Sequence, residues 1–180
     1  MVRIGLLSDT HNYLDQAVLT HFASCDEIWH AGDFGSDAAV AAPLRAIKPL
    51  RGVYGNIDGY DIRSVYPERL AFDCEGVRVL MTHIGGRPGR YEAEAKKAIQ
   101  GVKPALFICG HSHILRIQYD PSISCLYMNP GAAGKHGWHK VRTLIRFTID
   151  GKDMRDCEVI ELGNRTASGA IPDSEFRIPD

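Results

Sequence analysis

The sequence predicts a soluble α/β protein built as one domain. The chain has 180 residues, of which 44% are hydrophobic and 24% charged, the ordinary balance of a globular domain. In the first third, short apolar runs alternate with segments of helical spacing. In the remainder, apolar runs lie on either side of turn signals, which is typical of β-hairpins.

The first third alternates between strand and helix patterns. Val2–Ser8 is a short apolar run closed by polar turn residues, which predicts a strand. Leu14–Phe22 has helical spacing, and Asp26–Ala31 again resembles a strand. Ser36–Ile47 predicts a helix with its first residue as the N-cap, and Val53-Tyr54 leads into a turn. This order predicts parallel strands joined by right-handed crossovers.

The rest of the chain predicts a mixed sheet and one helix. Glu75-Gly76 and Asp150-Gly151 are hairpin signals, and the helix is expected at Tyr91–Gln100. The strands expected here are Arg69–Cys74, Val77–Thr82, Ala105–Cys109, Ile114–Tyr119, Ile123–Met128, Val141–Ile149 and Met154–Leu162. We assign residues 1–162 to the domain and expect residues 163–180 to form a loosely ordered C-terminal tail.

Charge and cysteine content exclude several function classes. The net charge of -1 argues against a large basic surface, so we expect no stable nucleic-acid complex. No apolar run approaches the roughly 20 residues of a membrane span. Polar residues follow the first apolar run at once and no cleavage site is recognisable, so a strand fits better there than a signal peptide. The five scattered cysteines are expected to be mostly buried, reduced thiols of a cytoplasmic protein.

Five predicted strands are each followed by residues that bind metals. The motifs are Asp9-x-His11, Gly32-Asp33, Gly55-Asn56, His83 and Gly110-His111-Ser112-His113. Because the carboxyl ends of strands line a common crevice, we expect these side chains to meet. In an extended backbone, alternate residues point to one side, so Asp9 and His11 should share a target, as should His111 and His113. Each motif is weak evidence alone, but all five in this order form a specific pattern.

This set of motifs resembles the calcineurin-like metallophosphoesterase superfamily. The short length, the Ser8-Asp9-Thr10-His11 opening and Asn129-Pro130-Gly131 are similar to its small phosphodiesterase branch. The resemblance extends to about residue 150. It implies a four-layer α/β/β/α sandwich with two central mixed β-sheets, and it makes residues 1–162 a metallophosphoesterase domain.

The resemblance also implies a binuclear metal centre. One ion would take Asp9, His11, Asp33 and His113, and the other would take Asp33, Asn56, His83 and His111, with Asp33 and a hydroxide as bridges. Three oxygen donors and four imidazoles suit Mn, Zn, Fe, Ni or Co better than Ca or Mg, and we expect two divalent ions, manganese first. The bridging hydroxide would be the nucleophile. The expected catalytic residues are His11, Asp33, Asn56 and His83.

One departure from the family pattern concerns the leaving group. Many members carry a histidine directly after the Gly-Asn pair, which helps to protonate or stabilise the leaving group. Ile57 occupies that position here and cannot donate a proton. Another group must therefore assist, or the substrates must have good leaving groups. The expected substrate contacts are Asn12, Arg87 and His136.

The expected function is that of a metal-dependent phosphodiesterase. Its substrate would be a small phosphodiester, with nucleotides among the candidates. The alternative is a non-catalytic scaffold, because the retromer scaffold subunit has the same fold and mainly binds partner proteins. A nuclease is a third reading, against which the neutral net charge and short length weigh. The sequence leaves the oligomeric state open, a homo-oligomer included.

Overall fold

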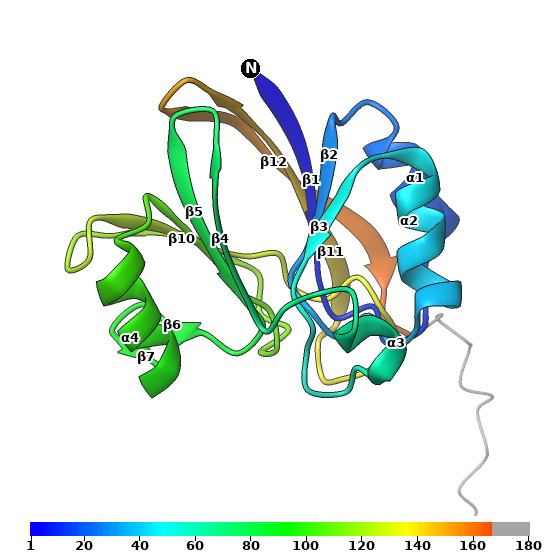
Figure 1. Ribbon diagram of the computed structural model, residues 1–180. Helices are drawn as coiled ribbons and strands as arrows, with labels where there is room; N and C mark the ends of the chain where they lie inside the picture. The colour runs from blue at the N-terminus through cyan, green and yellow to red at the C-terminus, as the bar shows by residue number, and fades with distance from the viewer. Residues whose placement is uncertain (167–180) are drawn as a thin grey trace, which may run out of the picture.

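Two five-stranded β-sheets lie face to face at the centre of the molecule, with helices on the two outer faces (Figure 1). The structure is a computed structural model that describes residues 1–166. The layers therefore follow the order helix, sheet, sheet, helix, which confirms the predicted α/β/β/α sandwich with two central mixed sheets.

The first sheet combines the N-terminal strands with the C-terminal hairpin. Its order is β12 (Asp153–Asn164), β11 (Val141–Asp150), β1 (Val2–Leu7), β2 (Glu27–His30) and β3 (Leu50–Gly52). Strands β1, β2 and β3 are parallel, as the strand–helix alternation predicts. Strand β11 runs antiparallel to β1, and Asp150-Gly151 lies at the turn to β12, as expected from this hairpin signal.

The second sheet is also mixed. Its order is β4 (Arg69–Cys74), β5 (Val77–Thr82), β8 (Leu106–Ile108), β10 (Cys125–Asn129) and β9 (Arg116–Asp120). Strands β5, β8 and β10 are parallel, and β4 and β9 are antiparallel edge strands. A small separate hairpin joins β6 (Gly86–Arg87) to β7 (Arg90–Tyr91).

The helix boundaries differ from the prediction, and one short helix, Tyr60–Arg63, is not expected from the sequence. The observed helices are α1 (Gln16–Phe22), α2 (Ala42–Ile47), α3 (Tyr60–Arg63) and α4 (Ala93–Val102). The segment predicted as one helix over Ser36–Ile47 is a π-helix at Asp37–Ala41 continued by α2, and the Ser36 hydroxyl accepts the Ala39 N–H as an N-cap does. The predicted start of the next helix at Tyr91 is wrong, because Tyr91 belongs to β7 and pairs with Gly86 of β6.

Several strand boundaries also differ from the prediction by one or two residues. Strand β3 ends at Gly52, and the Tyr54 N–H donates instead to the Pro67 carbonyl. Strand β12 continues to Asn164, so the first two residues of the predicted tail belong to the sheet. Residues 167–180, the greater part of that tail, lie outside the described residues.

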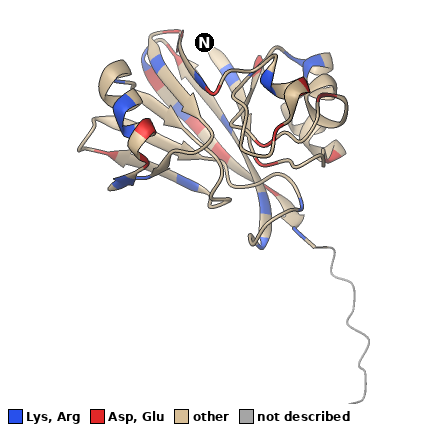
Figure 2. Cartoon of the chain, turned by 60° about the horizontal axis from the view of Figure 1, so that its bottom comes forward, with Lys and Arg blue, Asp and Glu red and all other residues tan. Residues whose placement is uncertain are grey.

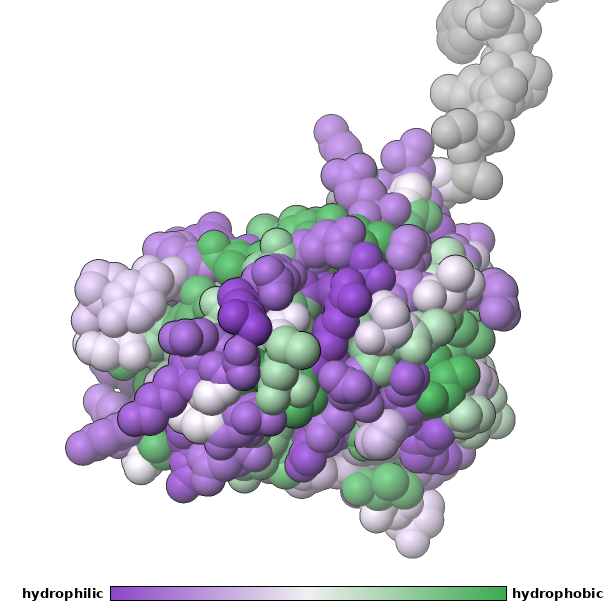
Figure 3. Space-filling view, turned by 90° about the horizontal axis from the view of Figure 1, so that it is seen from above, coloured by the Kyte–Doolittle hydropathy of each residue, from purple (hydrophilic) through white to green (hydrophobic). Residues whose placement is uncertain are grey.

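The core has three apolar layers, one between the sheets and one beneath each set of helices. Trp29 of β2 is fully buried between the sheets and meets Phe72 of β4 edge-on, with ring centroids 5.0 Å apart. Four cysteines are buried and Cys157 is exposed, and all five are free thiols. The surface in Figure 3 carries hydrophobic side chains in small groups among hydrophilic ones. Within residues 1–166, no helix has the length and apolar character needed to cross a bilayer.

The strands that precede the metal-binding motifs all end on one side of the molecule. Strands β1, β2 and β3 are parallel in the first sheet, as are β5 and β8 in the second. The loops that follow these five strands meet at the lower edge of both sheets (Figure 1). The site therefore lies where the two sheets join, and its residues come from both.

The layer between the sheets should dominate stability. Val79→Ala removes two carbons from a fully buried side chain in this layer, and we expect a loss of about 2 kcal/mol from the transfer and cavity terms. That loss corresponds to a fall in melting temperature of about 4–8 °C for a chain of this size. Val65→Ala is the matched control, because Val65 is 59% exposed. Thermal unfolding followed by circular dichroism tests this, and equal melting temperatures for the two variants would contradict it.

Candidate metal centre

The loops of the site adopt an unusual backbone conformation. Among the described residues, ten non-glycine residues have a positive φ, and six of them lie in these loops: Asp9, His11, Asn12, Asp33, His111 and His113. Asp, Asn and His tolerate this left-handed region better than other residues with a Cβ, although it still costs energy. The expectation of an extended backbone at these motifs is therefore wrong.

The left-handed backbone changes which side chains point together. Asp9 and His11 approach one another, with 4.0 Å between Oδ1 and Nε2. His111 and His113 do not share a target, because His111 faces Asp33 and His83 whereas His113 faces Asp9 and His11. The division of the two histidines between two ions, which the family resemblance implies, matches this arrangement.

Two glycines allow the loops to come close. A Cβ on Gly110 would lie 2.8 Å from Oδ2 of Asp9 and 2.7 Å from the Ser8 hydroxyl. A Cβ on Gly55 would overlap the Asp33 carboxylate. Any larger residue at either position would displace a carboxylate, so the glycine before each ligand motif is a steric requirement.

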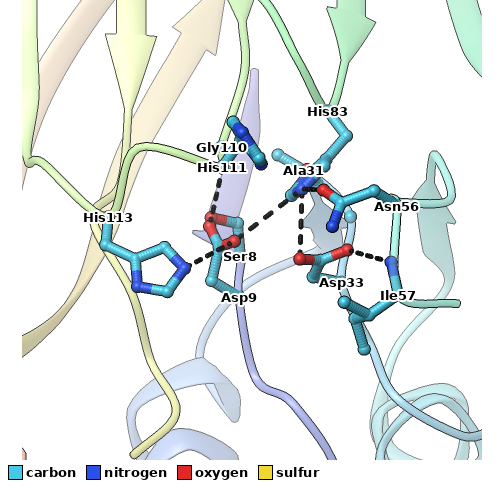
Figure 4. Close-up of polar contacts among 12 residues, drawn as sticks. Ser8, Asp9, Ala31, Asp33, Asn56, Ile57, His83, Gly110, His111 and His113 are labelled. Carbon is cyan, nitrogen blue, oxygen red and sulfur yellow. Dashed lines mark hydrogen bonds and ion pairs between the residues drawn. The ribbon is translucent and has the colours of Figure 1, made fainter. Parts of the chain in front are cut away.

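The first cluster contains Asp9, His11 and His113, whose nearest ligand atoms all lie within 4.8 Å of one another. Oδ1 of Asp9 lies 3.1 Å from Nε2 of His113 (Figure 4). Nevertheless, Asp9 Oδ1 and His11 Nε2 are buried atoms without a hydrogen-bond partner in residues 1–166. Buried polar atoms are normally satisfied, so two unpaired ligand atoms that face one space fit the binding of a cation there.

The second cluster contains Asp33, His83 and His111, again with ligand atoms within 4.8 Å of one another. Nδ1 of His83 donates to the Ala31 carbonyl at 2.8 Å, which in the neutral ring leaves a lone pair on Nε2. That nitrogen lies 3.2 Å from Oδ2 of Asp33 and 3.2 Å from Oδ1 of Asn56. With a neutral His83, the lone pair on Nε2 therefore faces the lone pairs of the Asp33 and Asn56 oxygens. A cation bound between these atoms would remove their mutual repulsion.

Asp33 lies between the two clusters. Its Oδ2 is 3.2 Å from Nε2 of His83 in the second cluster and 3.5 Å from Nε2 of His11 in the first. Its Oδ1 accepts the backbone N–H of Ile57 at 3.1 Å. One carboxylate oxygen is thus fixed by the backbone, while the other faces histidines of both clusters.

Asp9 is held in the same way. Its Oδ2 accepts hydrogen bonds from the Ser8 hydroxyl and from the His111 N–H, and its Oδ1 stays free toward the histidines (Figure 4). Fixing one oxygen while freeing the other orients a carboxylate for a metal, as partners around known metal sites do. The residues present therefore fit a pair of divalent ions.

Burial and charge act in opposite directions on the protonation of the histidines. Burial lowers the pKa of both His11 and His111 below the ordinary value, although nearby carboxylates oppose this. Burial also lowers the pKa of His83, but Asp33, Asp9 and the Ala31 carbonyl together outweigh burial and the net pKa is raised. For Asp33, burial raises the pKa and the hydrogen bond to His83 lowers it, with a net lowering. The site thus favours neutral His11 and His111 beside an ionised Asp33.

The expected substrate contacts lie at different places around the site. The cleft above both clusters, which we call the main cleft, has a volume of about 480 Å³. His136 lines it, and its ring centroid lies 4.8 Å from that of His11. Arg87 lines a neighbouring cleft together with His111. Asn12 is exposed beside the His11 loop and does not line the main cleft.

Several supporting residues escape sequence reasoning. The buried Asp58 accepts the N–H groups of Gly35 and Gly55, both at 2.7 Å, and so fixes the two loops that carry Asp33 and Asn56. Asn129 donates to the Gly110 carbonyl at 2.8 Å and fixes the loop of His111. The Asn-Pro-Gly motif draws attention to Asn129 in the sequence. No sequence pattern indicates the supporting role of Asp58, apart from its place two residues after Asn56.

His30 is a buried histidine that does not reach the ligands. It stacks on Phe34 with 3.6 Å between ring centroids, and its Nδ1 accepts the Gly32 N–H at 3.1 Å. Its other nitrogen lies 3.0 Å from the Thr10 hydroxyl. These contacts make His30 a packed histidine of the second strand.

Solved structures support the fold. An archaeal phosphodiesterase is 20% identical, with a TM-score of 0.71 over 89% of this chain and 99% of that chain. Wild-type Vps29 from Entamoeba histolytica, solved with Zn²⁺, is 15% identical, with a TM-score of 0.68 over 88% and 98%. A conserved protein from Streptococcus pneumoniae, described as a predicted phosphoesterase, is 20% identical, with a TM-score of 0.62 over 89% and 97%. At these identities the likeness concerns the fold alone.

The sequence comparisons give the family. No curated protein sequence matches the chain significantly. The family model of the calcineurin-like phosphoesterase superfamily domain matches residues 2–152, which include all five ligand motifs and both central sheets up to the start of β12. On this match and the fold, the chain belongs to the calcineurin-like phosphoesterase superfamily.

Proposed function

We propose that the protein is a phosphodiesterase that depends on two divalent metal ions. The observation that carries the proposal is the pair of adjoining histidine–carboxylate clusters with the Asp33 carboxylate between them. The first ion would be held by Asp9, His11, Asp33 and His113, and the second by Asp33, Asn56, His83 and His111. The mixed nitrogen and oxygen donors favour manganese, zinc, iron, nickel or cobalt.

The protein groups would bind and orient the phosphodiester. When bound, the ions lower the pKa of a water for attack on phosphorus and offset the negative charge that develops there. Asp33 and Asp9 keep their positions through backbone and serine hydrogen bonds, so little reorganisation is needed during the reaction. The exposed His136, next to His11 in the main cleft, can donate a hydrogen bond to a phosphoryl oxygen.

Ile57 restricts the leaving group. Its side chain lines the main cleft and is 45% exposed, so an apolar group occupies the position where many relatives have a proton donor. A leaving group that is stable as an anion needs no such donor. Diesters with such leaving groups, for example aryl diesters, should therefore react faster than diesters with alkoxide leaving groups.

A second candidate function is partner binding at the same face. Three exposed apolar residues line the main cleft: Trp138 is 100% exposed, Ile114 is 61% and Ile57 is 45%. Exposed apolar groups that surround a polar centre are a feature of protein interfaces. The fold similarity to Vps29 proteins is compatible with this candidate, and hydrolysis is what distinguishes the two.

Hydrolysis of bis-p-nitrophenyl phosphate is the first test. After chelation, the protein should be inactive, and Mn²⁺ or Zn²⁺ should restore turnover. Asp33→Asn should lower kcat by about a hundredfold or more, because it removes the charge between both clusters. His21→Ala is the control, since His21 lies on α1 away from the site. Full activity of Asp33→Asn would refute the proposed centre, and no turnover with two ions bound would favour partner binding.

Metal content should follow the two clusters. We expect two ions for each wild-type chain, and about one for His113→Ala, which removes a ligand from the first cluster alone. Because bound metal stabilises the folded state, the wild type should gain several degrees in melting temperature on adding Zn²⁺. Atomic absorption after dialysis, together with thermal unfolding, measures both quantities. Two tightly held ions in the variant would argue against this division of ligands.

Acid should release the metal. Protons compete with metal for the imidazoles, and burial already lowers the pKa of His11 and His111 below the ordinary value of about 6.5. Binding should therefore persist through neutral pH and weaken once the pH falls below that value. Zn²⁺ affinity measured by calorimetry across this range checks the expectation. Affinity that stays constant down to about pH 5 would contradict histidine ligation.

A further inference from the structure

A second cleft opens directly beside the metal centre. It has a volume of about 330 Å³ and lies between the His111 loop and the β6–β7 hairpin. His111, Ser112 and Ile114 line both this cleft and the main one. Because the two clefts share these residues, a molecule bound at the metal centre can extend into the second cleft.

Three arginines line the second cleft, which we call the arginine cleft: Arg87, Arg90 and Arg116. Arg87 and Arg90 are paired across the β6–β7 hairpin, and Arg116 begins β9. Nη1 of Arg116 lies 3.3 Å from the side-chain oxygen of Gln118, which is a neutral acceptor. Within residues 1–166, none of the three forms an ion pair with a carboxylate, so their charges are available to a ligand.

Within residues 1–166, six other arginines are neutralised by carboxylates, whereas Arg3, Arg63, Arg69 and Arg165 form no ion pair. Acidic and basic residues are interspersed along the described chain (Figure 2). The arginines that form ion pairs with Asp or Glu are Arg45, Arg51, Arg78, Arg142, Arg146 and Arg155. Against this background, three uncompensated guanidinium groups beside a metal centre form a local positive site in a chain with a net charge of -1.

The hairpin that carries two of these arginines is held firmly in place. The Tyr127 hydroxyl donates to the Gly86 carbonyl at 2.8 Å, and the Glu92 N–H donates to the Gly85 carbonyl at 3.2 Å. The Tyr91 hydroxyl donates to Asp120 at 2.7 Å. The backbone of Arg87 and Arg90 is therefore positioned in advance, which reduces the entropy lost when their side chains bind a ligand.

A third cleft shares Ile84 and Glu92 with the arginine cleft but has more acidic than basic residues in its lining. It has a volume of about 430 Å³ and adjoins Asn56 and His83. Its charged lining residues are Arg63, Arg69, Glu68, Glu92 and Glu94, an excess of acid. Arg63 already donates to the carbonyls of Asp58 and Gly55. In the arginine cleft, by contrast, Glu92 is the one acidic residue of the lining against three arginines.

We propose that the arginine cleft binds a second phosphate group of the substrate. The preferred substrates would then be nucleoside-type phosphodiesters that carry a further phosphate monoester, and this step rests on the proposed function. Guanidinium groups bind phosphate oxygens through paired, charge-assisted hydrogen bonds. Ile57, which marks the expected position of the leaving group, lines the main cleft and not the arginine cleft. The second phosphate therefore belongs to the ester substituent that remains attached to the product phosphate, and not to the leaving group.

A matched substrate pair tests the proposal. Thymidine 5′-(p-nitrophenyl phosphate) and the same compound with a 3′-phosphate release the same p-nitrophenol. We expect kcat/KM of the metal-loaded wild type to be about tenfold or more higher for the 3′-phosphorylated compound, the gain from one charge-assisted contact or more. The double variant Arg87→Gln with Arg116→Gln should lose this preference. Arg78→Gln, which alters an arginine paired with Asp73, should keep it.

A binding measurement without metal separates this proposal from the proposed function. Calorimetry on the metal-free protein should give tighter binding of thymidine 3′,5′-bisphosphate than of thymidine 5′-monophosphate, and the double variant should lose the difference. Failure to hydrolyse any diester, with this difference retained, would refute the enzyme and leave the phosphate site. Equal kcat/KM for both substrates, or a preference retained in the double variant, would overturn the phosphate site. The proposal would also be overturned if the double variant changed only the inhibition by inorganic phosphate, because the cleft would then be a site for free phosphate.

Discussion

The approach of the buried Asp33 carboxylate to histidines from two different sheets is the interaction on which the site depends. Its Oδ2 lies 3.5 Å from His11 and 3.2 Å from His83. His11 follows β1 of the first sheet, and His83 follows β5 of the second. A carboxylate removed from water must be compensated by charge or hydrogen bonds. The approach of the two sheets at this edge therefore depends on the imidazoles, the backbone N–H groups and the Ser8 hydroxyl that offset the charge of Asp33 and Asp9.

Much of the surrounding structure serves to hold these groups at short distances. The ligand loops adopt left-handed backbone at Asp9, Asp33 and His111, which is unfavourable for residues with a Cβ. The hydrogen bonds that Asp58 accepts from Gly35 and Gly55, and the one that Asn129 donates to Gly110, compensate for that cost. The strain lies in the loops, whereas the apolar layers of the sandwich supply the stability. This separation allows the site to be preorganised without weakening the core.

The sequence predicts the strands well and the loops poorly, for identifiable reasons. Strands such as Val77–Thr82 are apolar runs between turn signals, and burial on both faces gives a strong pattern. The β6–β7 hairpin has only two residues in each strand and contains Arg87 and Arg90, so no periodicity marks it. That the ligand side chains meet could be predicted from motif order, because parallel strands bring their carboxyl ends together. Their division between two clusters could not be derived from an extended backbone, since the φ values of His111 and His113 are positive.

The arrangement of clefts separates chemistry from specificity. On the proposed function, the ligand atoms would come from loops that the family motifs define, and they would act on any phosphodiester that reaches the ions. Discrimination must then come from groups that the motifs do not include, namely the arginine cleft on the His111 side, the acidic cleft on the His83 side and the exposed Trp138 above the centre. The two substituents of a bound diester would therefore meet different charges. The substituent that lies toward β6–β7 would meet arginines, and the one that lies toward α4 would meet an excess of acidic residues. A diester with unequal charge on its two substituents would therefore bind in one orientation, and that orientation determines which ester bond faces Ile57 and is cleaved.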